Sequence, residues 1–271
     1  GFKPTYGRVS RHGVFPVSWT LDTLGWMSRC VEDAALALDA VSGYDPRDPG
    51  SADVAPPSAA AALRARAAAP RIGMAGGFFE EHASPEVRAH TAWVAGALDA
   101  AGARLEPLAL PGSFSGIHEA QVAIDYSECA LVHRGAFSER PADYAPDVRS
   151  RIECGMLIPA AAYLQALRLR RRFRRDMAKA LGDHDALLTP ATPTPAPQDL
   201  STTGDPVFQS PWTVAGLPVA TIPTGLSRDG LPLAIQLVGR GFDDARLLAV
   251  AAWVEQVLGV ELGEPAAAAG R

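Results

Sequence analysis

Two short apolar runs near the end of the chain constrain its fold more than any other feature. They are Val219 to Ile222 and Leu233 to Val238, within the stretch PWTVAGLPVATIPTGLSRDGLPLAIQLVG at residues 211–239. Residues that tolerate tight turns separate the two runs, namely Gly225, Ser227, Asp229 and Gly230. Neither run alternates between apolar and polar residues, as a half-solvated strand would. We therefore predict two strands in a sheet that helices cover on both faces.

Three further runs predict more strands of the same sheet, at residues 71–75, 105–110 and 185–190. The pattern between the first two is helical, because it begins at the capping pair Ser84-Pro85 and stops at Gly102. A strand, helix and strand in this order close with a right-handed crossover, which favours parallel pairing. The sequence thus predicts an α/β fold with a mixed, largely parallel β-sheet core covered on both faces by helices.

The remaining chain is predicted to belong to one domain, residues 1–271. Apolar residues at helical spacing predict helices at 30–42, 117–137 and 159–181, and a last one from residue 242. Residues 52–70 are rich in Ala and Pro and predict a surface connection with one short helix, whereas residues 261–271 predict a loose tail. A chain of 271 residues with 48% hydrophobic residues is large enough for one such core.

Composition argues against several classes of protein. The net charge of -5 opposes general affinity for nucleic acid or anionic lipid. The three cysteines, Cys30, Cys129 and Cys154, form no C-x-x-C motif, so we expect no disulfide framework and no metal site. Without a long apolar run or a secretory signal, we expect a cytoplasmic protein with no membrane contact and no cofactor. Because the chain starts at Gly1 inside what reads as a motif, we also expect the true amino terminus to lie upstream.

Arg170 is the first candidate binding residue. The predicted helix at 159–181 has an apolar stripe, and Arg170 falls within it at the 3.6-residue period; the stripe consists of Tyr163, Ala166, Leu167, Phe173, Met177 and Leu181. A guanidinium against a core needs a carboxylate partner or a ligand anion. We therefore weigh a substrate-carboxylate anchor against a structural ion pair. The opposite face carries Arg168, Arg171, Arg172 and Arg175. Such a basic face could bind RNA, and the simpler alternative is that it faces solvent.

Glu128, His133 and Lys3 are further candidates with simpler structural readings. Glu128 and His133 lie on one predicted helix and suit acid–base chemistry, although neither their spacing nor their neighbours make a metal site. The alternative is a polar helix face or a hydrogen-bonded pair. For Lys3 the alternatives are a catalytic base and a structural lysine whose aliphatic chain lies along Phe2.

Five motifs in order along the chain resemble the amidase signature family, the serine amidohydrolases that include bacterial amidases and the A subunit of glutamyl-tRNA amidotransferase. They are GFKPTYGRVS at 1–10, LDTLGWMSRCVEDAA at 21–35, GYDPRDPGS at 43–51, DALLTPATP at 185–193 and SPWTVAGLP at 210–218. Two departures are visible, because Trp26 stands where many members have proline and Cys30 where a threonine helix cap is usual.

The resemblance implies the amidase signature fold and hydrolysis of an amide through a Ser-cisSer-Lys triad. It also implies that the triad lies upstream of Gly1, so that this chain is the C-terminal part of an amidase domain and supplies no catalytic residue. Arg170 matches the arginine that grips the substrate carboxylate in the amidotransferase. Glu128 lies in a segment similar to the AEA stretch of many amidases, and Gln209 and Trp212 precede the GLP turn near the cleft. We expect these four residues to bind substrate.

Three hypotheses follow for function. The first and favoured one is a stand-alone amidase with a small-molecule amide as substrate, because FQSPW and LGWM are similar to the bacterial enzymes. The second is the A subunit of a glutamyl-tRNA(Gln) or aspartyl-tRNA(Asn) amidotransferase. The third is a truncated fragment that acts as a scaffold or binding module. The expected partners are the missing N-terminal segment and, in a possible homodimer, a second copy, with no direct contact to nucleic acid.

Overall fold

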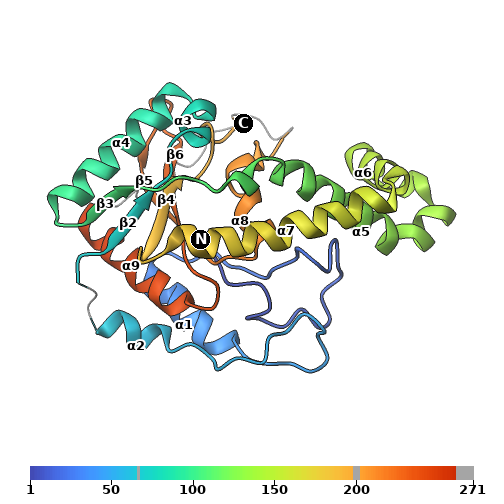
Figure 1. Cartoon of the computed structure of the whole chain (residues 1–271), viewed down its shortest axis with the longest axis horizontal. Coiled ribbons are helices and arrows are strands. Elements are labelled where there is room, and N and C mark those ends of the chain that lie inside the picture. The colour runs from blue at the N-terminus through green and yellow to red at the C-terminus, as the bar shows by residue number, and fades with distance from the viewer. Residues whose placement is uncertain (66–67, 198–201, 261–271) are drawn as a thin grey trace, which may run out of the picture.

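A six-stranded sheet forms the centre of the computed structural model, which describes residues 1–65, 68–197 and 202–260 (Figure 1). The strands lie in the order β1-β5-β6-β4-β2-β3. Their bounds are β1 Phe2–Lys3, β2 Arg71–Met74, β3 Arg104–Pro107, β4 Ala186–Pro190, β5 Val219–Leu226 and β6 Pro232–Val238. The predicted C-terminal tail at 261–271 lies outside the described residues.

The strand directions make the sheet mixed. β2 pairs in parallel with β3, as the strand-helix-strand pattern predicted, and also with β4. β6 runs antiparallel to β4 and β5, and β1 runs antiparallel to β5. Strands β2, β3, β4 and β5 therefore point one way, and only β1 and β6 of this sheet point the other way. The predicted mixed, largely parallel α/β sheet is confirmed.

The two apolar runs that led the prediction form the hairpin β5–β6. A turn at 227–231 joins them, in which the Gly230 N–H donates to the Ser227 carbonyl and Gly230 has a φ of +76°. β5 continues past the predicted run through Pro223 and Gly225, where the register shifts in a bulge. β6 is buried over its second half, because Gln236, Leu237 and Val238 have no exposed surface.

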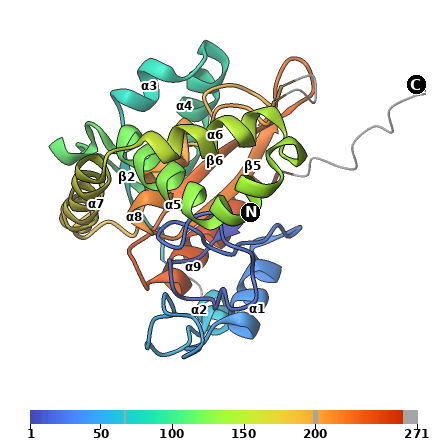
Figure 2. The same ribbon diagram turned by 90° about the vertical axis from the view of Figure 1, so that its right-hand side faces the viewer.

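Helices cover both faces of the sheet, and side chains along β4 alternate between them. Leu187 points to one hydrophobic cluster, whereas Ala186 and Leu188 point to the other. The first cluster includes residues of α3 Phe78–His82, α5 Ile117–Glu139, α7 Ala160–Leu181 and α8 Ser210–Ala215. The second includes residues of α1 Val31–Val41, α2 Ala59–Arg64, α4 Pro85–Ala100 and α9 Asp244–Leu258. Figure 2 shows α1, α2 and α9 together below the strands.

Local capping explains where the predicted helices begin. The Ser84 hydroxyl accepts from the Val87 N–H at the start of α4, with Pro85 in the first turn. At α1 the Cys30 thiol accepts from the Asp33 N–H at 3.5 Å, so the cysteine occupies the cap position. The other unusual residue, Trp26, donates its backbone N–H to the Phe2 carbonyl at 3.0 Å, a bond that proline cannot make.

Three helices were not predicted, namely α3, α6 Pro146–Leu157 and α8. α3 and α8 are only one or two turns long, so no apolar period identifies them. α6 and the adjoining halves of α5 and α7 project beyond the sheet (Figure 1). α6 crosses α5 closely at Gly155, where a Cβ atom would overlap the Tyr126 carbonyl oxygen. Only glycine allows this approach.

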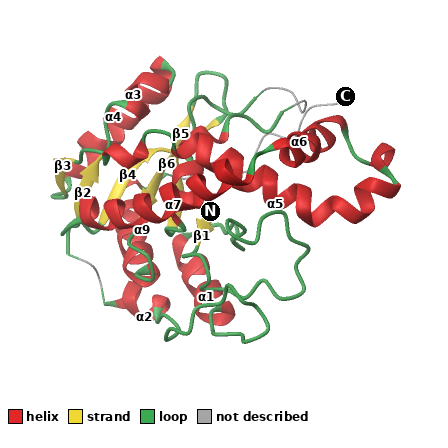
Figure 3. Ribbon diagram, turned by 45° about the vertical axis from the view of Figure 1, so that its right-hand side comes forward, coloured by secondary structure: helices red, strands yellow, loops and turns green. Residues whose placement is uncertain are grey.

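Loops fill the region between β1 and α1, drawn green in Figure 3. Residues 52–70, predicted to be a surface connection, contain α2, and Ala59 of that helix is fully buried in the second cluster. No helix among the described residues has the length and the apolar character needed to cross a membrane.

Candidate functional site

The short helix α8 organises the candidate site. Pro211 stands in its first turn, and Gly216 ends it with a φ of +66°, a left-handed conformation that favours glycine. Trp212 anchors the helix, because its ring is fully buried and stacks on Phe79 at 5.9 Å between ring centroids. The predicted binding residue Trp212 therefore lies in the hydrophobic core beneath the site.

Arg170 reaches the carboxyl end of α8 from α7, and its side chain is 9% exposed. Its Nε donates to the Val214 carbonyl at 2.9 Å, and its Nη2 donates to the Thr20 carbonyl at 3.1 Å. The guanidinium also lies over the Tyr6 ring, 5.7 Å from the centroid. Among the described residues no carboxylate lies within ion-pair distance of it. Burial, and then the like charge of Arg174, lower the pKa of Arg170 to about 10.

Glu128 lies beneath this arginine and is 1% exposed. Its carboxylate accepts four hydrogen bonds, from the Ser18 hydroxyl at 2.6 Å, the Thr20 N–H at 3.0 Å, the Thr20 hydroxyl at 2.5 Å and the Tyr163 hydroxyl at 2.7 Å. Burial and the bond to Glu128 raise the pKa of Tyr163 to about 12. The protein's own donors therefore occupy the Glu128 oxygens.

Thr20 connects the two candidate residues. Its N–H and hydroxyl donate to Glu128, and its carbonyl accepts from Arg170. Glu128 thus fixes the loop whose carbonyl orients the guanidinium. His133 takes no part in this network, because its Nδ1 bonds to the Tyr144 hydroxyl at 3.0 Å instead. The structure therefore gives Glu128 and His133 separate partners.

Gln209 lies at the other end of α8, beside a cavity of about 320 Å³ between β1, β5, β6 and α8. Its Nε2 donates to the Ala191 carbonyl at 2.7 Å. Gln236 of β6 lines the same cavity and donates from Nε2 to the Phe208 carbonyl at 2.8 Å. Gln209 and Gln236 each keep a buried Oε1 atom without a hydrogen-bond partner among the described residues.

Lys3 also lines this cavity. Its Nζ donates to the Leu217 carbonyl at 2.5 Å and to the Pro4 carbonyl at 3.2 Å, so the ammonium points at backbone. Burial lowers the pKa of Lys3 to about 8, and the negative charge of Asp244 partly offsets this effect. The hydroxyls of three serines in this part of the structure bond to other groups: Ser10 to Asp45, Ser18 to Glu128 and Ser210 to the Pro206 carbonyl.

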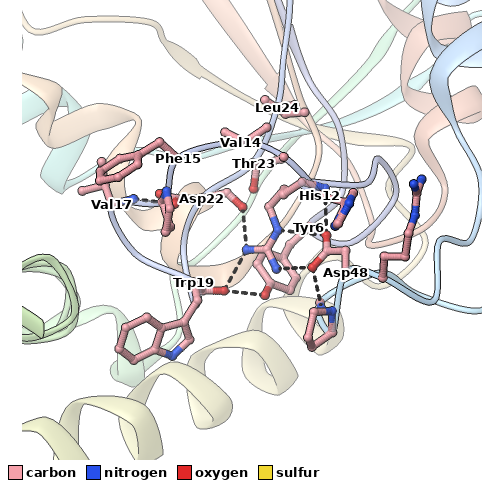
Figure 4. A pocket seen from close by; sticks show the side chains of 16 residues that line it. Tyr6, His12, Val14, Phe15, Val17, Trp19, Asp22, Thr23, Leu24 and Asp48 are labelled. Atoms are coloured by element: carbon pink, nitrogen blue, oxygen red, sulfur yellow. Dashed lines mark hydrogen bonds and ion pairs between the residues drawn. The ribbon is translucent and has the colours of Figure 1, made fainter. Parts of the chain in front are cut away.

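A second and larger cavity, of about 710 Å³, opens among the loops before α1 (Figure 4). Arg11 crosses it and pairs with Asp48 at 3.0 Å, and its Nη1 also donates to the Trp19 carbonyl at 2.8 Å. Phe15 is 71% exposed at its rim. Tyr6 lines this cavity and lies close to both arginines, because its ring centroid is 4.7 Å from the Arg11 guanidinium carbon and 5.7 Å from that of Arg170.

Several residues of this region had no distinctive sequence signal. Thr20 and Tyr163 position Arg170 and Glu128 mostly through contacts that span more than a hundred residues of sequence. Gln236 is the one polar residue in the run LAIQLV, and that interruption was the available clue. Where the structure describes the chain, no three His, Cys, Asp or Glu side chains meet in a group that would hold a metal ion.

The sheet, the buried arginine and the cavity define a class of protein. They describe a layered α/β protein with a concave site of small-molecule size beside its sheet, as enzymes often have. The family follows from comparison of sequences. The profile of the family described as Amidase matches residues 1–248, and the chain belongs to this family.

Relatives within the family differ in the activities that their names state. The chain is 35% identical to the A subunit of the glutamyl-tRNA(Gln) amidotransferase of Granulibacter bethesdensis, over 94% of this chain and 57% of the relative. It is 36% identical to the AtzE subunit of the 1-carboxybiuret hydrolase of Pseudomonas sp. strain ADP, over 92% of this chain and 56% of the relative. The chain thus spans a little over half the length of these relatives.

Solved structures agree with the fold. A chain of a protein complex described as vestigial, which is said to reveal the evolutionary origins of an s-triazine catabolic enzyme, superposes with a TM-score of 0.86 at 33% identity, over 96% of this chain and 58% of that one. The A subunit of the glutamyl-tRNA(Gln) amidotransferase of Thermotoga maritima superposes with a TM-score of 0.74 at 26% identity, over 94% and 57%. The mixed α/β sheet is therefore the amidase fold in part.

Proposed function

We propose that this chain is the substrate-binding part of an amidase that hydrolyses the C–N bond of a small carboxylic amide. The observation that carries the proposal is the state of Arg170 within an amidase-family chain. Its guanidinium is buried at the end of α8, is held by two carbonyls and lacks a carboxylate partner among the described residues. A substrate carboxylate would supply the missing negative charge.

The bond-breaking groups belong, in this proposal, to the part of the relatives' length that this chain does not span. A lysine takes the nucleophile's proton through a bridging serine, and the nucleophilic serine oxygen attacks the amide carbonyl. The proton passes to the departing nitrogen, which leaves as ammonia or an amine, and an acyl-serine ester remains. Water then attacks the ester, releases the carboxylic acid and restores the serine hydroxyl. Coverage of 56–58% in the relatives supports this division.

Glu128 acts as a positioning residue in this proposal. Its two carboxylate oxygens already accept four hydrogen bonds. Neither oxygen therefore has a free lone pair that could take a proton from the substrate. Glu128 holds Thr20, and the Thr20 carbonyl orients Arg170. Trp212 is likewise a positioning residue, because it supports α8 from the core. We therefore assign direct substrate contact to Arg170 and Gln209.

A kinetic comparison tests the role of Arg170 in the longest natural form of the protein. Arg170→Met should raise KM for amides that carry a carboxylate by about 10- to 100-fold, the loss of one charged hydrogen bond, and leave neutral amides nearly unchanged. Arg171→Met, at an exposed neighbour on α7, is the matched control. Equal effects on both substrate groups would remove Arg170 as the anchor, and absence of any amide turnover would refute the amidase proposal.

A transferase function is the second candidate, because a relative at 35% identity is named as part of an amidotransferase. The two candidates differ in what they require. An amidase releases ammonia from small amides without other proteins, whereas one component of an amidotransferase depends on partners that receive the ammonia. Full activity of the purified protein alone favours the amidase. If neither activity is found, the chain is a binding module, which was the third hypothesis.

A further inference from the structure

The outer face of α7 carries a row of exposed cations that we call the basic stripe, which consists of Arg168, Arg172, Arg175 and Lys179. At 3.6 residues per turn, these positions fall within about 60° of the helix circumference. Phe173 and Met177 lie on the opposite side of the helix and are fully buried in the first hydrophobic cluster. The packing of α7 against that cluster therefore turns the basic stripe toward solvent.

The charges of the basic stripe are mostly unbalanced. Its successive members are three or four residues apart, so each neighbouring pair joins like charges, an arrangement that destabilises a helix. Arg172 has one ion pair, with Asp176 at 3.5 Å. Where the structure describes the chain, the other three members have no ion pair. An anionic partner would offset this repulsion.

Exposed apolar side chains continue the basic stripe beyond its N-terminal end. Leu164 lies one turn before Arg168 on the same face of α7 and is 57% exposed. Met156 and Leu157, the last two residues of α6, are 49% and 82% exposed. We call these three residues the apolar end. Exposed apolar residues that gather beside charged ones mark interaction sites.

This combination of side chains distinguishes between anionic partners. A single-stranded nucleic acid binds through its phosphates and through base stacking on aromatic side chains. The aromatic residues of α7 point inward, because Phe173 is buried and the Tyr163 hydroxyl bonds to the buried Glu128. The net charge of -5 also opposes a long polyanion. An anionic bilayer takes up the apolar face of a helix, but that face of α7 is packed in the core.

We propose that the basic stripe and the apolar end together dock an acidic segment of a partner protein. Carboxylates of the partner pair with the stripe, and apolar residues at one end of the segment cover Leu157 and Leu164. A guanidinium suits this role because it can bind a carboxylate through two parallel hydrogen bonds. Arg170 lies on the buried side of α7, so docking needs no amide turnover. The inference is therefore independent of the proposed function.

The test uses the longest natural form of the protein and a fluorescent helical peptide. The peptide has two leucines at one end and four glutamates at the spacing of the basic stripe. Fluorescence anisotropy should show saturable binding that weakens as salt is added. Replacing the glutamates by glutamine, or the leucines by alanine, should weaken binding about tenfold.

A double variant tests the protein side of the contact. Arg172→Glu combined with Arg175→Glu should weaken peptide binding at least tenfold, because it removes two attractions and adds two repulsions. Both side chains are exposed, so the fold does not depend on them. Arg64→Glu, at an exposed position of α2, is the matched control and should leave binding unchanged.

Equal affinity of the glutamate and glutamine peptides, or of the double variant and the unaltered protein, overturns the inference. Tighter binding of oligouridylate or of phosphatidylserine vesicles, lost in the double variant, also overturns it and assigns the face to RNA or to a membrane. A dimer that the double variant abolishes in sedimentation would make a second copy the occupant instead. A structure of the longest natural form in which another segment of the same protein covers the basic stripe overturns it as well.

Discussion

Arg8 and Arg170 are both buried, but they are compensated in different ways. Arg8 is 4% exposed and pairs with Asp244 at 3.4 Å, and its two other nitrogens donate to the Ala55 and Phe242 carbonyls. Asp244 itself is fully buried and accepts from Thr5. Within the described parts of the chain, Arg170 donates to carbonyls alone. Arg8 therefore has a carboxylate partner, whereas Arg170 has none within ion-pair distance among the described residues and is joined to Glu128 only through Thr20.

Asp244→Ala should give the largest effect, because it leaves the Arg8 guanidinium buried without a counter-charge. We expect a loss of about 3–5 kcal/mol in the free energy of unfolding, measured with urea. Asp243→Ala, at the exposed neighbouring residue, is the control. If Asp244→Ala lowers the free energy of unfolding no more than Asp243→Ala does, the counter-charge of Arg8 contributes nothing. Arg8 and Arg170 would then not differ in how their charges are compensated.

Lys3 should make the unfolding free energy depend on pH. Its pKa is about 8 when folded and near its ordinary value of 10.5 when unfolded. Between these values the unfolded state binds more protons, so stability rises with pH, by about 3 kcal/mol across the whole window. The rise should vanish in Lys3→Met and persist in Lys179→Met, the other lysine of the chain. An identical pH profile for Lys3→Met would contradict the burial of this ammonium group.

Arg170→Met should lower the free energy of unfolding less than Asp244→Ala does, measured with urea in the same way. It removes two charged hydrogen bonds but also relieves a buried charge, so the net loss should be about 1 kcal/mol. Arg171→Met on the same helix provides the reference for an exposed arginine. A loss as large as that of Asp244→Ala would mean that Arg170 is a structural residue like Arg8.

Tyr6→Phe should have the smallest effect. The ring beside Arg11 and Arg170 is retained, and only the hydroxyl bond to the Trp19 carbonyl is lost, at an exposed position. We expect a change of about 0.5 kcal/mol in the free energy of unfolding. Tyr6→Leu removes the ring as well and should cost more. If the two variants are equal, the stacking of the guanidinium groups on Tyr6 contributes nothing.

The sequence predicted those features that depend on local pattern. Arg170 was found because it falls on a stripe of 3.6-residue period, and Phe173 and Met177 of that stripe are indeed fully buried. α4 was found because Ser84 and Pro85 mark its start. In each case residues within a few turns of one another carry the whole signal.

Features that depend on distant contacts were not predictable in this way. Thr20 has no local motif, and its role arises because α5 and α7 meet the same loop. Gln236 became a site candidate only when Phe208 and Pro190 were seen to hold its nitrogen. The sequence predicted that Trp212 binds substrate directly, and it could not show that the ring lies in the core. Burial of this kind is decided by the folded topology.

The irregular course of β5 has a consequence for association between molecules. β1 pairs with β5 at Val219 and Ala220, and the Gly1 backbone extends these contacts to Thr221. Among the described residues no strand pairs with this border of β5 beyond Thr221. Pro223 has no N–H to offer, and the bulge before Gly225 breaks the spacing that a partner strand would need. The same residues that interrupt the pattern of a regular strand thus discourage edge-to-edge aggregation.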